Sequence, residues 1–210
     1  FTGSTRTAKI VAAQCATTMT PVVLECGGKD PVIVAVDANL ERAVDATIWS
    51  AMANAGQSCI GAERVYVDER VADKFVELAV QLAKTIHAGA PGDGNYGPAT
   101  MPSQIKVIQS HIKSAIKDGG RCAYGGPESV KPPFVQPVIL LDVPEDSAAM
   151  REETFGPTII INRVKSMREA IDLSNASSYG LGANVWSKRQ GKKIAAELAC
   201  GMVAINSTFS

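Results

Sequence analysis

The run Pro31-Val32-Ile33-Val34-Ala35-Val36 decides which class of fold this sequence adopts. It is apolar from end to end, and the preceding run Pro21-Val22-Val23-Leu24-Glu25-Cys26 is almost as apolar. Neither run alternates strictly between apolar and polar side chains, and continuous strands of this kind are typical of a sheet that is covered on both faces. We therefore predict that both runs are strands of a buried sheet.

Helix-like and strand-like segments alternate along the rest of the chain. Apolar side chains at helical spacing predict helices near 40–51, 69–86 and 102–118, and shorter helices are expected at 5–16, 166–174 and 189–199. Further strands are expected at 63–67, 121–124, 135–141, 158–163, 182–187 and 201–206. This order predicts an α/β fold with a mainly parallel sheet in three layers, with helices on both faces.

Composition excludes several classes of function. The 210 residues are 46% hydrophobic, and 21 basic residues balance 21 acidic ones, which argues against binding to nucleic acid or to a membrane surface through charge. Five widely spaced cysteines form no metal-binding motif and fit a reducing compartment such as the cytoplasm. The two histidines, His87 and His111, lie in helix-like segments without an evident partner, and no metal site is expected.

The stretch Asn54-Ala55-Gly56-Gln57-Ser58-Cys59-Ile60-Gly61 lies between a predicted helix and a predicted strand. Glycines on both sides of Cys59 would let a substrate approach the backbone closely, and the backbone N–H of Cys59 could stabilise an oxyanion. On its own, this pattern favours a buried, inert thiol over a nucleophile, because free cysteines are often buried.

Glu25 ends the first apolar run, just before Gly27-Gly28. We expect it to be part-buried at the carboxyl edge of the sheet, where ligand sites of α/β proteins form, with a pKa raised toward that of a general base. A solvated or salt-bridged strand end is the alternative interpretation. A thiol and a carboxylate base are the minimum set for forming and then hydrolysing a thioester.

Five motifs, taken in order, resemble those of the NAD(P)-dependent aldehyde dehydrogenase superfamily over nearly all 210 residues. They are Phe1-Thr2-Gly3-Ser4-Thr5, Leu24-Glu25-Cys26-Gly27-Gly28-Lys29-Asp30-Pro31, Gly56-Gln57-Ser58-Cys59, Glu152-Glu153-Thr154-Phe155-Gly156-Pro157 and Tyr179-Gly180-Leu181-Gly182-Ala183. The resemblance implies oxidation of an aldehyde to a carboxylic acid with NAD or NADP. It implies a small-molecule aldehyde as substrate and a homo-oligomeric parent protein.

The resemblance also implies roles for particular residues. Cys59 would be the nucleophile and Glu25 the base that activates water. The cofactor contacts would be Gly3 and Ser4 near its pyrophosphate, Glu153 at the nicotinamide ribose and Phe155 beside the nicotinamide ring. Gln104 is a further candidate ribose contact.

The chain begins at Phe1, in what reads as the middle of an element, so we expect a fragment. Residues 1–20 would be a remnant of the cofactor-binding domain and residues 21–210 the catalytic domain. The fragment alone is expected to lack NAD-linked aldehyde oxidation.

Cys26 replaces the leucine that usually follows the base in the family. It is either a packing variant or a partner for a disulfide with Cys59 under oxidation. Two other functions stay open. One is a CoA-acylating relative, against which Glu25 argues, and the other is a non-catalytic, partner-binding paralogue, against which Cys59 and Glu25 argue.

Overall fold

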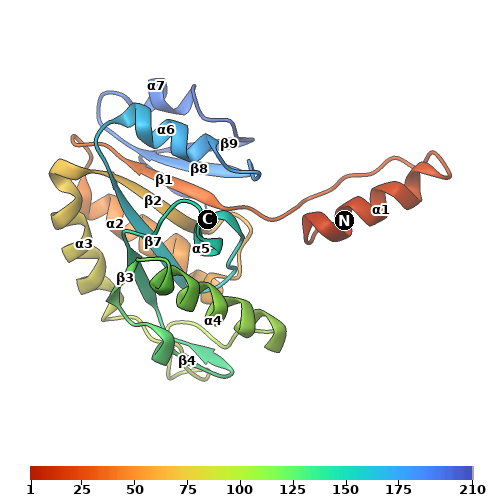
Figure 1. The fold of residues 1–210 in the computed structure, drawn as a ribbon, viewed down its shortest axis with the longest axis horizontal. Helices are drawn as coiled ribbons and strands as arrows, with labels where there is room; N and C mark the ends of the chain where they lie inside the picture. The colour runs from red at the N-terminus through yellow and green to blue at the C-terminus, as the bar shows by residue number, and fades with distance from the viewer. Residues whose placement is uncertain (210) are drawn as a thin grey trace.

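The computed structural model describes residues 1–209, and its centre is a seven-stranded sheet (Figure 1). In sheet order the strands are β3 (Arg121–Tyr124), β6 (Val138–Leu141), β7 (Thr158–Val164), β2 (Ala62–Asp68), β1 (Asp30–Val34), β8 (Gly182–Trp186) and β9 (Met202–Ile205). Only β3 runs antiparallel to its neighbour. The predicted α/β class with a mainly parallel sheet is therefore confirmed.

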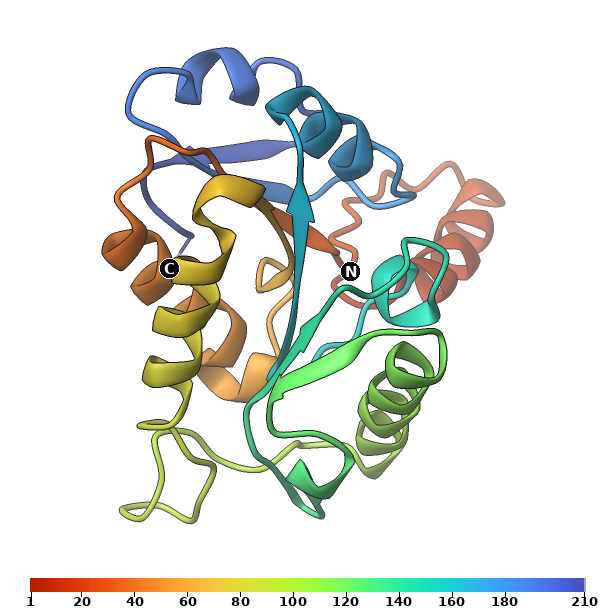
Figure 2. The same ribbon diagram turned by 60° about the vertical axis from the view of Figure 1, so that its left-hand side comes forward.

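Helices cover both faces of this sheet (Figures 1 and 2). They are α2 (Leu40–Met52) and α3 (Glu69–Ala83) on one face, and α4 (Pro102–Lys117), α5 (Ala148–Arg151), α6 (Met167–Asn175) and α7 (Gly191–Ala195) on the other. Within β1, Val32 and Val34 belong to the core under α2 and α3, whereas Ile33 belongs to the opposite core. A strand that buries both of its faces has no polar side to display, which explains the continuous apolar run from which the fold was predicted.

The helix boundaries follow from local chemistry. Asn39 caps α2 by accepting from the backbone N–H of Arg42, and Asp68 caps α3 by accepting from that of Arg70. Pro102 occupies the first turn of α4, where its missing N–H costs no hydrogen bond. None of the helices formed by residues 1–209 is long and apolar enough to cross a membrane.

The predicted strand at 21–26 is wrong. These residues belong to an extended segment in which only Glu25 forms a bridge, to Thr2, and that bridge lies outside the main sheet. Val23 is 74% exposed, so the apolar side chains of this run have no layer to pack against. An apolar run predicts a buried strand only where a neighbouring strand is available, and here the neighbour is the short stretch 1–3.

Two other boundaries differ from the prediction. The expected strand at 135–141 is split into β5 (Phe134–Val135) and β6, and β5 pairs instead with β4 (Val130–Lys131) in a small hairpin. Pro137 lies in the gap, where it has no N–H to give to a sheet. The expected helix at 189–199 is only the five-residue α7.

The first helix, α1 (Thr5–Ala16), stands apart from the sheet and is joined to it by the segment 17–29 (Figure 1). Ser4 is its N-cap and accepts from the backbone N–H of Thr7 at 3.3 Å. Ile10 on this helix is 64% exposed, so α1 adds little to the core.

Candidate active site

The predicted motif segments converge just before the first residues of β1, β2 and β7. Gly28 lies so close to the loop 57–61 that a Cβ atom added there would collide with the backbone oxygen of Cys59. Gly56 lies equally close to the backbone of Gly156 and Pro157. Three segments that are far apart in the sequence are thus packed backbone to backbone, and any larger side chain at either glycine would force them apart.

Cys59 lies in a loop with an unusual backbone. After α2, the short turn η1 (Ala53–Gly56) places Asn54, Ala55 and Gly56 at φ values of 53°, 59° and 67°. The carboxamide of Asn54 donates to the Gln57 carbonyl at 3.0 Å, and that of Gln57 donates to the Asn54 carbonyl at 2.9 Å. A turn from Ser58 to Gly61 then leads into β2 and leaves Cys59 half-buried.

Glu25 departs from the expectation. It is exposed and does not end a strand of the sheet, so the prediction that it is part-buried at the carboxyl edge is wrong. Its backbone pairs with the start of the chain instead, since its carbonyl accepts from Gly3 at 3.0 Å and its N–H donates to Phe1 at 2.8 Å. Glu25 and Gly3 are therefore brought together, three residues along the chain from the contact of Gly28 with Cys59.

Glu153 lies against Gly27 and Gly28. Its Oε1 atom accepts from the backbone N–H of Gly28 at 3.1 Å, and its own N–H donates to the hydroxyl of Tyr179 at 3.3 Å. Burial raises the pKa of its carboxyl group, while the Gly28 hydrogen bond opposes that rise. Glu153 is thus a half-buried carboxylate that faces Gly27 and Gly28, the segment that packs against the Cys59 loop.

A buried ion pair, which we did not predict, holds the 152–157 segment in place. Lys29 pairs with Glu63, and its ammonium also donates to the Thr154 hydroxyl at 3.1 Å. The Glu63 carboxylate accepts from the backbone N–H groups of Thr154 at 2.8 Å and Phe155 at 2.9 Å. The signal in the sequence was a charged pair, Glu63-Arg64, at the start of a fully buried strand.

The hydrogen bonds of Glu63 constrain the backbone of Phe155. Its φ of 50° is in the left-handed region, which a phenylalanine adopts only where the surroundings enforce it. The Glu63 hydrogen bond to its N–H supplies that constraint. The ring itself is only half-buried, so it is available to contact a ligand.

The side of this segment toward α4 is held by two more side chains. Gln104 donates to the Thr154 carbonyl at 2.6 Å, and His111 lies 3.1 Å from the Thr154 hydroxyl. His111 is buried, which lowers its pKa, and it is 3.6 Å from Glu152. The expectation that it lacks a partner is therefore wrong.

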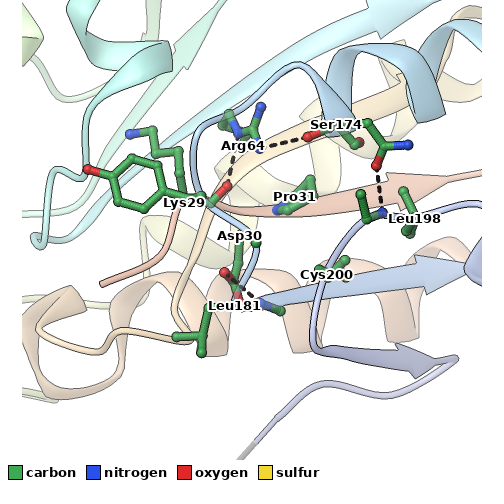
Figure 3. Close-up of a pocket in the computed structure, with 14 residues that line it drawn as sticks. Lys29, Asp30, Pro31, Arg64, Ser174, Leu181, Leu198 and Cys200 are labelled. Carbon is green, nitrogen blue, oxygen red and sulfur yellow. Dashed lines mark hydrogen bonds between the residues drawn. The ribbon is translucent and has the colours of Figure 1, made fainter. Parts of the chain in front are cut away.

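Asp30 connects the Gly27-Gly28 segment to the Tyr179–Ala183 motif (Figure 3). Its Oδ1 atom accepts from the backbone N–H of Gly182 at 3.2 Å. Its Oδ2 atom is buried and has no hydrogen-bond partner among residues 1–209. Burial raises the pKa of Asp30 to about 7. This carboxyl group lines a small pocket with Arg64, Ser174 and Cys200 (Figure 3).

Known proteins are similar to this chain in sequence. The sequence model of the aldehyde dehydrogenase family matches residues 1–210. The 2-hydroxymuconic semialdehyde dehydrogenase of Pseudomonas putida is 35% identical over 219 residues, which cover 100% of this chain and 45% of that protein. The glutarate-semialdehyde dehydrogenase of the same species is 37% identical over 211 residues, or 99% and 44% of the two chains.

Solved structures give the same result. The lactaldehyde dehydrogenase of Escherichia coli superposes with a TM-score of 0.94 at 34% identity, covering 100% of this chain and 45% of the other. The NADP-dependent glyceraldehyde-3-phosphate dehydrogenase of Bacillus halodurans, solved with NADP, gives 0.95 at 35% identity, with 100% and 44% covered. The chain thus spans less than half the length of these relatives, and it belongs to the aldehyde dehydrogenase family.

Proposed function

We propose that this chain supplies the nucleophile and the base for the oxidation of an aldehyde to a carboxylic acid with NAD or NADP. The observation that carries the proposal is the packing of the Cys59 loop against Gly28 and against Gly156. That packing leaves the cysteine half-buried in a loop whose backbone shape is fixed on two sides, which suits a group that must be both reachable and positioned.

The first step uses Cys59. Its sulfur gives up a proton and forms a bond to the carbonyl carbon of the aldehyde, and the carbonyl oxygen takes up the displaced electron pair. The backbone N–H of Cys59 is the donor that this chain offers to the resulting oxyanion. Bound NAD or NADP would supply the acceptor for the hydride that leaves this carbon as the oxyanion re-forms the C=O bond, and the substrate would remain attached to Cys59 as a thioester.

The second step uses Glu25. Its carboxylate takes a proton from water, the oxygen of that water attacks the thioester carbon, and the carbon–sulfur bond breaks to release the acid and the thiol. Glu25 is exposed, so it is open to water, and it lies three residues before Gly28, which packs against the Cys59 loop.

The residues of this chain fit the cofactor. The Glu153 carboxylate is acceptor-only and half-buried, and it takes one N–H from Gly28, so it has acceptor capacity left for ribose hydroxyl groups. The half-buried ring of Phe155 offers a flat surface to nicotinamide. Gly3 and Ser4 lie at the start of the 12-residue helix α1, where backbone N–H groups favour a pyrophosphate.

An ester assay tests both roles without a hydride acceptor. A chromogenic acetate ester should acylate Cys59 and release its phenolate in a burst equal to the protein concentration. Cys59→Ala should abolish the burst, whereas Glu25→Gln should keep it and slow the later steady release. A burst that survives Cys59→Ala would falsify the assignment of the nucleophile.

We also propose that residues 1–20 belong to a cofactor-binding domain and residues 21–210 to a catalytic domain. More than half of each relative lies outside the match, so we expect these 210 residues alone to reduce neither NAD nor NADP. NADH formed by the purified chain from any aldehyde would contradict this. We propose a cytoplasmic location, which the five free cysteines support, and a homo-oligomer for the whole protein.

A further inference from the structure

Cys26 lies in the segment that packs on the proposed nucleophile. It is two residues before Gly28, where an added Cβ atom would collide with the backbone oxygen of Cys59. Successive Cα atoms are about 3.8 Å apart, so the Cα of Cys26 lies within about 8 Å of the Cα of Gly28. A disulfide needs Cα atoms roughly 4.4–6.8 Å apart, so the bond requires the Cys26 segment to close on the Cys59 loop against which Gly28 already packs.

The segment that carries Cys26 lies outside the helices and the main sheet. Residues 17–29 form no helix or strand of the sheet, and Glu25 beside Cys26 is exposed. Both Cys26 and Cys59 are free and half-buried, so a small oxidant can reach either sulfur. The segment is anchored at Gly28, through its contact with Cys59 and its hydrogen bond to Glu153, so its movement keeps Cys26 near the loop.

The other three cysteines lie in other parts of the structure. Cys15 is on α1, which stands apart from the sheet, Cys122 is on β3 at one edge of the sheet, and Cys200 precedes β9 at the opposite edge. None of the three lies on the segments that meet around Gly28 and Gly56. Of the four cysteines other than Cys59, Cys26 is the one whose own segment packs against the Cys59 loop.

We propose that Cys26 and Cys59 form a reversible disulfide when the protein meets a hydroperoxide. The Cys59 thiolate attacks the peroxide oxygen, which breaks the O–O bond and leaves a sulfenic acid on Cys59 and one molecule of water or alcohol. The Cys26 sulfur then attacks the Cys59 sulfur, the S–O bond breaks, and a second water leaves. The two thiols are oxidised by two electrons in total, and the peroxide is reduced.

The consequence for activity rests on the proposed function of Cys59. A sulfur held in a disulfide cannot attack an aldehyde, so oxidation switches the site off. The same bond keeps the sulfenic acid from further oxidation to sulfinic acid, a state that dithiols do not reverse. Cys26 would therefore act as the resolving cysteine, which the leucine usual at this position in the family could not do.

Peptide mapping of the oxidised chain tests the bond directly. After one equivalent of hydrogen peroxide, two of the five free thiols should disappear and return with dithiothreitol. A protease that cleaves after glutamate cuts the chain between Glu25 and Cys26, so Cys15 and Cys26 fall in different peptides. Under non-reducing conditions, the peptide that begins at Cys26 should be found joined to the peptide that carries Cys59. A bond from Cys59 to any other cysteine would overturn the proposal.

Variants supply the second readout. In Cys26→Ser, and in Cys26→Leu if the serine variant does not fold, excess peroxide should convert Cys59 to sulfinic acid. Cys200→Ser is the matched control and should still form the disulfide. Equal amounts of sulfinic acid in the original chain and the Cys26 variants would contradict the proposal. The mapping does not depend on catalysis, so a disulfide without an ester burst would refute only the proposed function, and a burst without a disulfide only this inference.

Discussion

Lys29 and Glu63 are two charged side chains that lie almost fully inside the protein. Lys29 is 1% exposed, and burial lowers its pKa, whereas its pairing with Glu63 favours the charged form. The same carboxylate binds the N–H groups of Thr154 and Phe155. The pair therefore determines the position of the segment that carries Glu153, although neither of its members is a proposed catalytic group.

Breaking this pair should destabilise the fold strongly. Lys29→Met leaves the Glu63 carboxylate buried without its cation, and we expect a loss of roughly 3–5 kcal/mol in the free energy of unfolding. The exposed pair of Lys74 and Glu77, 3.0 Å apart, is the matched control, and Lys74→Met should cost less than about 1 kcal/mol. Urea denaturation of both variants measures the difference, and equal losses would contradict it.

Asp30 should make stability depend on pH. Its pKa in the folded chain is about 7, above the ordinary value of 3.8, so the folded state binds a proton that the unfolded state releases. The stability that the folded chain gains by binding this proton is fully present below pH 3.8 and is lost as the pH rises through 7. Asp30→Asn cannot ionise and still offers an acceptor to Gly182, so it should be more stable than the original chain at pH 8, by roughly 2–4 kcal/mol.

The measurement is the melting temperature of both proteins between pH 5 and pH 8. The melting temperature of Asp30→Asn should exceed that of the original chain by an amount that increases as the pH rises. Glu153, with a raised pKa, adds a slope of the same sign, and His111, with a lowered pKa, adds the opposite slope, but both are common to the two proteins. Parallel curves would show that Asp30 does not titrate in this range.

At the residue scale, motifs could be predicted where they fill consecutive positions. Gly56 to Cys59 and Glu152 to Pro157 stand as unbroken runs, and the structure brings these runs together. Glu63 could not be predicted in the same way, because its partners lie more than thirty residues upstream and about ninety downstream. The exposure of Glu25 was missed for a related reason, since position in an apolar run does not say whether a layer covers it.

The turn before Cys59 is the element with the most strained backbone. Asn54, Ala55 and Gly56 follow one another with positive φ. Glycine adopts this region freely and asparagine tolerates it, but alanine does so at a cost of roughly 1–2 kcal/mol. Two hydrogen bonds between Asn54 and Gln57, and two between Gln57 and Thr100, stabilise this strained conformation of the turn.

Glycine substitutions should reveal that strain. Ala55→Gly relieves the left-handed conformation while losing a small buried methyl group, so we expect little or no loss of stability. Ala46→Gly, within α2, should lose about 1 kcal/mol because it lowers helix propensity without relieving strain. Thermal unfolding of the two variants compares them, and a larger loss for Ala55→Gly would show that the turn is not strained.

At the element scale, the residue pattern predicted every strand of the main sheet. The inner strands are largely buried on both faces and have the apolar composition that this requires, whereas the edge strands β3 and β9 are partly exposed. It failed at 21–26 and at 136–137. In the first case the apolar residues lie in a segment without a covering layer. In the second, the side chain of Gln136 binds the backbone of Ala88, and Pro137 has no N–H to donate. The strand pairing is therefore interrupted at these two residues.

Viewed as a whole, the molecule has a packed body and an outlying helix. The body contains the sheet and two apolar cores, one on each face. The helix α1 contributes a single buried residue, Ala8, and is joined to the body by the segment 17–29 (Figure 1). Met19 in this segment is 87% exposed.

Removing residues 1–20 should therefore leave the body folded. We expect the shortened chain to unfold cooperatively with a melting temperature close to that of the original, because few core contacts are lost. Ile33→Ala, in the middle of β1, is the contrasting variant and should cost about 3 kcal/mol. Calorimetry measures both, and loss of cooperative unfolding in the shortened chain would show that α1 is part of the body.

The central position of β1 also constrains how the chain can fold during its synthesis. One neighbour, β2, follows within about thirty residues, but the other, β8, is formed by residues 182–186. Until that late stretch leaves the ribosome, one edge of an apolar strand has no partner. Parallel pairing over such a distance is slow, because a long loop must close first. While residues 35–181 are being made, the nascent chain therefore exposes one edge of an apolar strand, and we expect it to be prone to aggregation during that interval.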